Sequence, residues 1–138
     1  MKPLEEKELL LRVATKVAAK QLEEGGFFPF GATLSPNRQV QLLVPESMKR
    51  DATKDELDAY WGAKLLAAAN AARCNTVCSC ADSGVLADDG SVVRAVFIHI
   101  EHAYEYSEDI LYPYRKGDGP SVSFEKPTIE PTKHQVFT

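Results

Sequence analysis

The sequence lacks the short motifs that mark many catalytic sites. It contains no GxGxxG or GxxxxGK phosphate loop, no HExxH zinc motif, no GxSxG nucleophile turn and no EF-hand loop. P-loop nucleotide hydrolysis, zincin proteolysis and α/β-hydrolase chemistry are therefore without their usual signatures. Because no other catalytic pattern replaces these motifs, the sequence favours a protein that is not an enzyme and holds no cofactor.

Positive charge and long apolar runs are also scarce. The chain has 16 lysines and arginines against 20 aspartates and glutamates, which gives a net charge of −4. It has no basic patch with interleaved aromatic residues. This balance argues against nucleic acids and anionic membranes as partners. No stretch reaches the ~18 apolar residues that a membrane-spanning helix needs, so we expect neither kind of partner.

An export signal and a disulfide framework are absent as well. Residues 1–7 lack the apolar run of a signal peptide. The three cysteines, Cys74, Cys78 and Cys80, are an odd number in a short stretch, which is a poor basis for disulfide pairing. Both observations are typical of a protein in a reducing compartment, so we expect a cytoplasmic location.

The composition that remains is that of a globular domain. The chain has 138 residues, of which 44% are hydrophobic and 26% charged. These fractions are close to the globular average and exclude wholesale disorder. A chain of this length forms one domain and buries about two-thirds of its unfolded surface.

The first half of the chain predicts two helices and a hairpin. Pro3 suits the first turn of a helix, and Gly25 suits its end. Thr53 and Glu56 match a capping box at the start of a second helix, whose apolar face would carry Leu57, Trp61, Leu65, Ala68 and Ala72. The expected elements are a helix at 3–24, strands at 27–34 and 38–44, a polar connector at 45–52 and a helix at 53–72.

The second half predicts strands. The Asp88-Asp89-Gly90 sequence is a strong hairpin turn. Both faces of the strand that follows are largely apolar, so we expect this strand to be central and covered on both sides. The expected elements are strands at 76–86, 91–101 and 107–115, a break at 117–120, a short strand at 121–124 and an extended arm at 125–138.

The element order is therefore α-β-β-α-β-β-β. Tandem hairpins with two amphipathic helices predict an α+β fold, in which the helices pack on an antiparallel sheet of about five strands. We expect one domain at residues 1–124 and a dangling C-terminal arm at 125–138.

Two stretches resemble a set of small, uncharacterised bacterial proteins. They are FPFGA at 28–32, and IEH at 100–102 followed by YPY at 112–114. The resemblance covers about residues 4–124 and implies no reaction, because that family carries no established one. The element order is also similar to the roadblock and profilin-like architectures, which mostly serve as dimerising scaffolds. The closing helix of the roadblock type is missing here.

The cysteines and a nearby histidine form one candidate site. In a strand, Cys74, Cys78 and Cys80 would share a face. If strands 76–86 and 91–101 pair across the turn, Cys78 lies near His99 and Glu101. A Cys78, Cys80, His99 and Glu101 group could ligate zinc or provide a thiol nucleophile. A one-residue slip in register moves the cysteines to the opposite face, where they pack in the core.

Aromatic residues form the second candidate site. Tyr104 and Tyr106 lie at a predicted turn, where at least one of them should be exposed. Tyr112 lies on the last long strand and Trp61 on the second helix. Aromatic side chains with a polar tip are frequent at interfaces. These four residues are our candidates for a protein interface, and Trp61 with the tyrosines could instead line a small-ligand pocket.

The function we expect is that of a small cytoplasmic, non-catalytic, protein-binding domain of the scaffold type that forms a homodimer. Two alternatives stay open at this stage. One is a metal-binding or thiol-dependent enzyme built on the cysteine and histidine group. The other is a domain that binds a small ligand beside Trp61.

Overall fold

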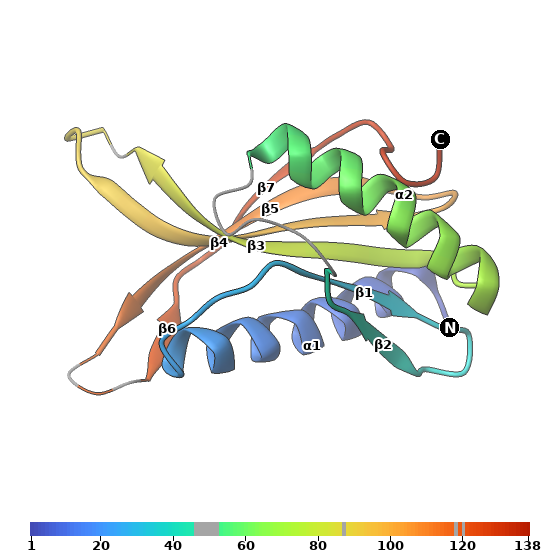
Figure 1. The fold of residues 1–138 in the computed structure, drawn as a ribbon, viewed down its shortest axis with the longest axis horizontal. Helices are drawn as coiled ribbons and strands as arrows, with labels where there is room; N and C mark the ends of the chain where they lie inside the picture. Colours follow the sequence, from blue (N-terminus) through green and yellow to red (C-terminus); the bar gives the residue numbers. More distant parts are fainter. Residues whose placement is uncertain (46–52, 87, 118, 120) are drawn as a thin grey trace.

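The computed structural model describes residues 1–45, 53–86, 88–117, 119 and 121–138 (Figure 1). Nearly all of the predicted connector at 45–52, and part of the predicted break at 117–120, lie outside the described residues. The elements are α1 (Pro3–Glu23), β1 (Phe30–Leu34), β2 (Val40–Leu43), α2 (Lys54–Ala72), β3 (Thr76–Leu86), β4 (Val92–His102), β5 (Ser107–Lys116), β6 (Val122–Phe124) and β7 (Thr128–Pro131).

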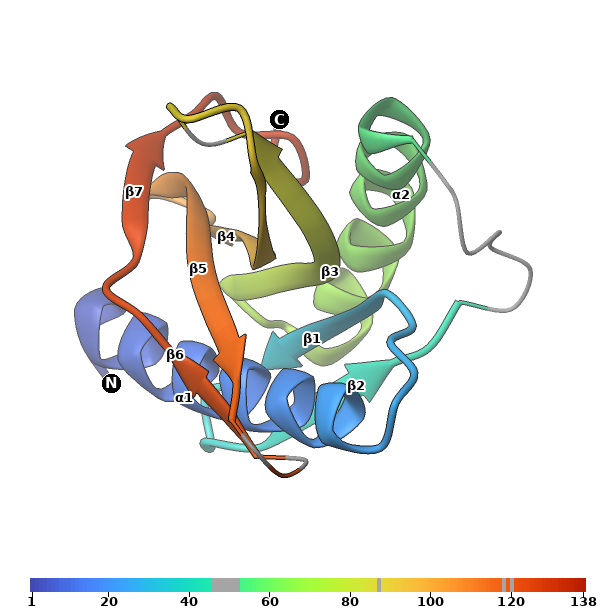
Figure 2. The same cartoon turned by 90° about the vertical axis from the view of Figure 1, so that its left-hand side faces the viewer.

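The fold is α+β, as predicted. Within the described residues the strands form one antiparallel sheet of seven strands in the order β2-β1-β3-β4-β5-β6, and β7 pairs with β5. α1 lies on one face of the sheet and α2 on the other (Figures 1 and 2). The count exceeds the expected five because β6 and β7 lie one after the other along the outer edge of β5.

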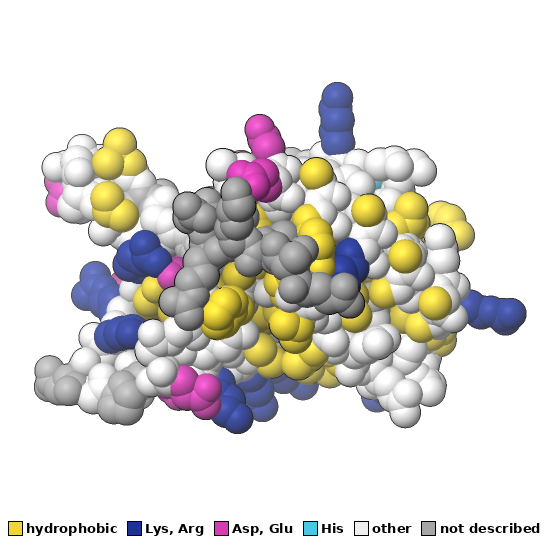
Figure 3. Space-filling model, viewed as in Figure 1, with side chains coloured by type: hydrophobic (Ala, Val, Ile, Leu, Met, Phe, Trp, Pro, Cys, Tyr) yellow, Lys and Arg dark blue, Asp and Glu magenta, His cyan; other side chains and the backbone are white. Residues whose placement is uncertain are grey.

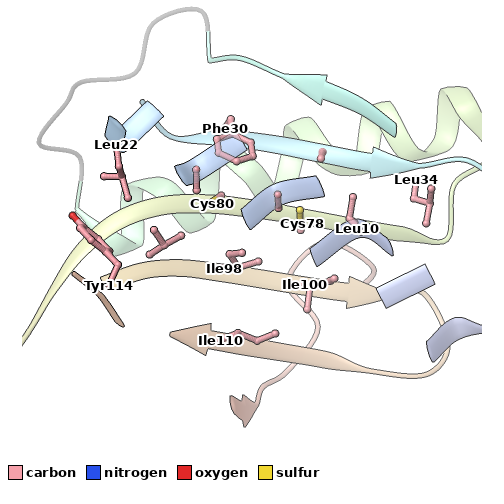
Figure 4. Close-up of a cluster of buried hydrophobic side chains, with 14 residues drawn as sticks. Leu10, Leu22, Phe30, Leu34, Cys78, Cys80, Ile98, Ile100, Ile110 and Tyr114 are labelled. Carbon is pink, nitrogen blue, oxygen red and sulfur yellow. The ribbon is translucent and has the colours of Figure 1, made fainter. Parts of the chain in front are cut away.

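α1 follows the predicted pattern. Pro3 stands at its first turn, Glu5 and Glu6 lie at the positive end of the helix dipole, and Gly25 takes a φ of +86° just beyond its end. Four residues at a spacing of four face the sheet and are buried, namely Leu10, Ala14, Ala18 and Leu22. They pack on one core cluster, which Figure 4 shows between α1 and the strands β1, β3, β4 and β5.

α2 begins at the predicted capping box. The Thr53 hydroxyl accepts the backbone N–H of Glu56, and the Glu56 carboxylate accepts the backbone N–H of Thr53. Its buried residues are Trp61, Leu65 and Ala69. The predicted face was thus wrong at its C-terminal end, where Ala69 is buried and Ala72 is exposed.

Gly31 in β1 permits the close approach of α2. A Cβ atom at this position would lie 2.7 Å from Cζ3 of Trp61 and 3.1 Å from Cδ2 of Leu65. Only a glycine leaves room for the indole directly against the strand. The glycine in the FPFGA stretch therefore has a packing role on the α2 side of the sheet.

The C-terminal residues are not a dangling arm. β7 pairs with β5, with Ile129 opposite Ile110. Beyond β7, Val136 is only 2% exposed and belongs to the core cluster under α2. The segment is extended, as predicted, but it is bonded to the sheet rather than free. The sequence offers no local signal for this attachment, because the strand partners of β7 lie 17–23 residues away.

Candidate functional site

The register of the β3–β4 hairpin separates the predicted cysteine and histidine group. Cys78 lies opposite Ile100, and Ser79 lies opposite His99. Residues that face each other across strands share a face of the sheet. Cys78 and Cys80 therefore face α1, whereas His99 and Glu101 face α2. The structure does not bring these four residues together, and no group of three or more potential metal ligands occurs among the described residues.

The cysteines of β3 pack as small apolar residues. Cys78 and Cys80 are fully buried among Leu10, Phe30 and Ile98 (Figure 4). Burial raises the pKa of Cys78 to about 12 and that of Cys80 well above its ordinary value of 9.0. A thiol in this state is a poor nucleophile and a poor metal ligand. Cys74 precedes β3 and lies in the other core cluster, so the three cysteines do not share a face.

His99 lies between two carboxylates in the sheet. Its Nε2 is 2.5 Å from Oε2 of Glu101, and its Nδ1 is 2.7 Å from Oδ1 of Asp109. Burial opposes the charged form of His99, but the hydrogen bonds and charges of the two carboxylates outweigh it and raise its pKa. Because both ring nitrogens face carboxylate acceptors, this arrangement favours the doubly protonated, cationic form of the ring.

Glu101 holds the C-terminal segment. Its side chain is fully buried and accepts the backbone N–H groups of Gln135, Val136 and Phe137 at 2.8–3.2 Å. Burial opposes its ionisation, but the hydrogen bonds from His99 and from these N–H groups lower its pKa. All acceptor capacity of Glu101 is used within the chain. His99 and Glu101 therefore have a structural role that joins β4 to the C-terminus.

A second buried polar group, which sequence reasoning missed, joins α1 to the end of the sheet. Glu6 Oε1 accepts the hydroxyl of Thr76 at 2.7 Å and lies 3.8 Å from Nε2 of His102. His102 Nδ1 accepts the backbone N–H of Tyr104 at 3.1 Å. These groups are buried and have their partners within the chain, so this network also has a structural role.

The candidate tyrosines fall into different environments. Tyr104 is 81% exposed at the turn between β4 and β5, as predicted. The Tyr106 hydroxyl donates to the carbonyl of Pro3 at 3.2 Å, and Lys7 lies over its ring at 5.1 Å. Tyr112 stacks edge-on against Phe124 of β6. Tyr106 and Tyr112 are therefore parts of the packing on the α1 side, and Tyr104 alone is well placed to touch a partner.

Trp61 lines a pocket between α2 and the sheet. The pocket has a volume of about 160 Å³. Its side-chain walls include Leu57 and Trp61 of α2, and Phe97 of β4. Lys54 and Asp58 lie at the same pocket and pair with each other at 2.8 Å. The pocket expected beside Trp61 is present, but none of the tyrosines lines it.

β3 has an open edge next to this pocket. β4 pairs with β3 along its whole length, whereas β1 pairs with it only from Thr76 to Cys80. From Ala81 to Leu86, no strand of the described residues lies on the β1 side. Figure 1 shows this half of the β3–β4 hairpin extending beyond the end of β1. The sequence did not indicate this edge, because it follows from the unequal lengths of β1 and β3.

The hydrogen-bond pattern shows which groups this edge presents. The N–H of Ala103, just after β4, donates to the carbonyl of Asn75, just before β3. In an antiparallel pair such residues alternate, so the odd-numbered residues of β3 bond to β4. The main-chain groups of Asp82, Gly84 and Leu86 therefore turn towards the open side, and no partner for them occurs in the described chain.

A second, wider pocket lies on the α1 side of the same strand. Its volume is about 590 Å³. Its wall includes Phe27 beyond α1, Asp82 of β3, Arg94 of β4, and Tyr114 and Lys116 of β5. Asp82 is bonded to Arg94 and to the Tyr114 hydroxyl. Figure 3 shows the Lys and Arg side chains that gather between the ends of the β3–β4 and β5–β6 hairpins.

Comparisons of the chain with protein-family models, with curated proteins and with solved structures found no match. The resemblance to small bacterial proteins therefore stays a prediction, as does the likeness to roadblock and profilin-like architectures. No helix in the described ranges combines the length and apolar character needed to cross a bilayer.

Proposed function

We propose that this chain is a small protein-binding domain of the scaffold type, and that its partner adds a strand to the open edge of β3. The observation that carries the proposal is the run of main-chain groups at Asp82, Gly84 and Leu86 that have no partner within the described residues. Such an edge is a template for a further strand, and proteins either protect it or use it for binding.

The apolar end of the hairpin supports this proposal. Leu86 is 73% exposed and its cross-strand neighbour Val92 is 65% exposed. Exposed apolar side chains beside an unpaired edge favour association. The outer strands of the sheet are less suitable, because β2 and β7 have four residues each and β6 has three. The carbonyl that follows β2, at Val44, also accepts a hydrogen bond from Lys64 at 3.1 Å.

The proposal includes the cellular location and the homo-oligomer that the sequence predicts. All three cysteines are free, which suits a reducing cytoplasm. A second copy of the chain is one partner that can present a strand to β3. A metal-dependent or thiol-dependent reaction is not proposed, since Cys78 and His99 lie on opposite faces of the sheet.

Site-specific photo-crosslinking tests the proposal. A benzoylphenylalanine at position 86 is irradiated in the native host cell, with position 4 as the control, because Leu4 is 61% exposed on α1. We expect a protein adduct from position 86 that disappears when Gly84→Pro removes an outward N–H. Native mass spectrometry of the purified protein shows whether that partner is a second copy. Equal adducts from both positions, or none from position 86, would contradict the proposal.

A further inference from the structure

The two pockets flank the open edge of β3, and their lining indicates which side chains a partner strand would carry. Ala81 and Ser83 of β3 line only the pocket at Trp61, whereas Asp82 between them lies at both pockets. Ala81 and Ser83 are odd-numbered, and they face α2 with Ser79 and His99. Asp82 is even-numbered, and it faces α1 with Cys78 and Cys80. Neighbouring positions of β3 thus border pockets on opposite faces of the sheet.

A strand added to β3 would alternate between these pockets. Successive side chains of a strand point to opposite faces, so every second side chain of the added strand lies over the α2 side. The side chains between them lie over the α1 side. One stretch of extended chain therefore directs side chains to both faces of the sheet, each of which carries one of the pockets.

The pocket on the α2 side suits an apolar side chain. Leu57, Trp61 and Phe97 supply its apolar surface. Its volume of about 160 Å³ is close to the roughly 150 Å³ of apolar cavities that take up benzene. The charged residues at this pocket are Lys54, Asp58 and Asp82, and each already has an ion-pair partner: Lys54 pairs with Asp58, and Asp82 pairs with Arg94. A charged side chain entering here would find no unpaired opposite charge.

The pocket on the α1 side suits an acidic side chain. Arg94 and Lys116 bring two positive charges to it, and Asp82 brings one negative charge. Both oxygens of Asp82 are bonded, one to Arg94 and one to Tyr114. Lys116 has no ion-pair partner in the part of the chain that the structure describes. This local excess of positive charge is opposite in sign to the net charge of the chain, which is −4.

We propose that the added strand is an extended segment of a partner protein in which apolar and acidic side chains alternate. The apolar side chains enter the pocket at Trp61, and the acidic ones face Arg94 and Lys116. The inference rests on the proposed function, because it uses the same edge of β3. It adds to that function the chemical class of the partner segment.

Defined peptides test the inference. The first probe is the acetylated amide Glu-Leu-Glu-Leu-Glu-Leu, which matches the six residues of the open edge. Two comparators replace either all glutamates by lysine or all leucines by glycine. Trp61 is the only tryptophan in the chain, so its fluorescence reports filling of the pocket on the α2 side. Isothermal titration calorimetry measures the affinity independently.

We expect the first peptide to bind saturably, with a dissociation constant below about 1 mM. Both comparators should bind at least about tenfold more weakly, since one meets repulsion and the other leaves the apolar pocket unfilled. Lys116→Glu should weaken binding of the glutamate peptide and strengthen binding of the lysine peptide. Lys133→Glu changes the net charge equally at an exposed position away from both pockets, and should leave binding unchanged.

Two further variants separate the pocket from the edge. Ala81→Leu fills the pocket at Trp61, and we expect it to reduce binding of the leucine-containing peptide at least about fivefold. Ala67→Leu adds the same bulk at an exposed position of α2 and should have no effect. Gly84→Pro should abolish binding of every peptide. Circular dichroism verifies that each variant folds, and Leu86→Pro, which also removes an outward N–H of the open edge, replaces Gly84→Pro if that variant does not.

The outcomes distinguish the two proposals. Equal binding of the glutamate and lysine peptides, both lost in Gly84→Pro, would overturn the partner class and leave the edge as the binding site. Binding that Gly84→Pro does not change would overturn both proposals. A dimer that Gly84→Pro dissociates, and that the glutamate peptide does not displace, would identify a second copy as the occupant and also overturn the partner class.

Discussion

Replacing Glu101 by glutamine tests the attachment of the C-terminal segment most directly. The substitution keeps the shape of the side chain but removes its charge. It leaves His99 with Asp109 as its only anionic partner, and it turns an amide N–H₂ group towards backbone donors. At least one N–H group among residues 135–137 then loses its acceptor, because a neutral amide has only one oxygen.

The expected loss follows from the burial of the pair. Hydrogen bonds to a charged group contribute about 1.5–3 kcal/mol each, and removal of one partner of a buried ion pair costs about 3–5 kcal/mol. The Glu101 side chain is fully buried and the His99 side chain is 4% exposed, so solvent cannot replace the lost partner. We expect Glu101→Gln to lower the free energy of unfolding by about 3 kcal/mol. For a chain of this length that corresponds to a fall in Tm of roughly 10 °C.

Urea denaturation followed by circular dichroism measures this loss. Glu105→Gln is the matched control, because Glu105 is exposed at the adjacent turn, and it should change stability by less than about 0.5 kcal/mol. Hydrogen exchange should also become faster at the amides of residues 135–137 in Glu101→Gln alone. A variant as stable as the wild type, with unchanged exchange at these amides, would refute the structural role of Glu101.

Three further predictions concern the core. Because the pKa of His99 is raised, its stabilising contribution is fully present below its ordinary pKa of 6.5 and is lost as the pH rises through the higher folded value. Between about pH 6 and about pH 9, urea denaturation should therefore show a larger loss of unfolding free energy for the wild type than for His99→Gln. Equal losses in the two proteins would contradict this prediction. Gly31→Ala should cost about 1–3 kcal/mol in the same assay, since its Cβ would overlap Trp61. Cys78 should react with a thiol reagent at neutral pH only when the core opens, so labelling as fast as in the unfolded chain would contradict its burial.

The sequence predicted the elements that local chemistry determines. The capping box at Thr53 located the start of α2, and the run from Thr76 to Leu86 was predicted with the bounds that β3 has. Capping and periodic burial act over a few residues, and a sequence displays them directly. The α+β class followed from the order of these elements.

The candidate site was less predictable because it depends on register and on unequal strand lengths. Leu86 lies opposite Val92, which leaves five residues in the connection, a length that the Asp-Asp-Gly signal alone does not specify. A shift of one residue would have placed Cys78 on the face of His99. The open edge arises only because β1 ends its pairing at Phe30, opposite Cys80. Neither feature has a local sequence signal.

The division of the core between two faces has a consequence for how the chain unfolds. Trp61 lies on the α2 side, and Cys78 and Cys80 lie on the α1 side. Tryptophan emission and thiol accessibility thus report separately on the docking of the two helices. Since β3 contributes residues to both clusters, loss of either helix exposes the strand that holds the other. We expect the two signals to change at the same denaturant concentration, which is the mark of a single cooperative unit.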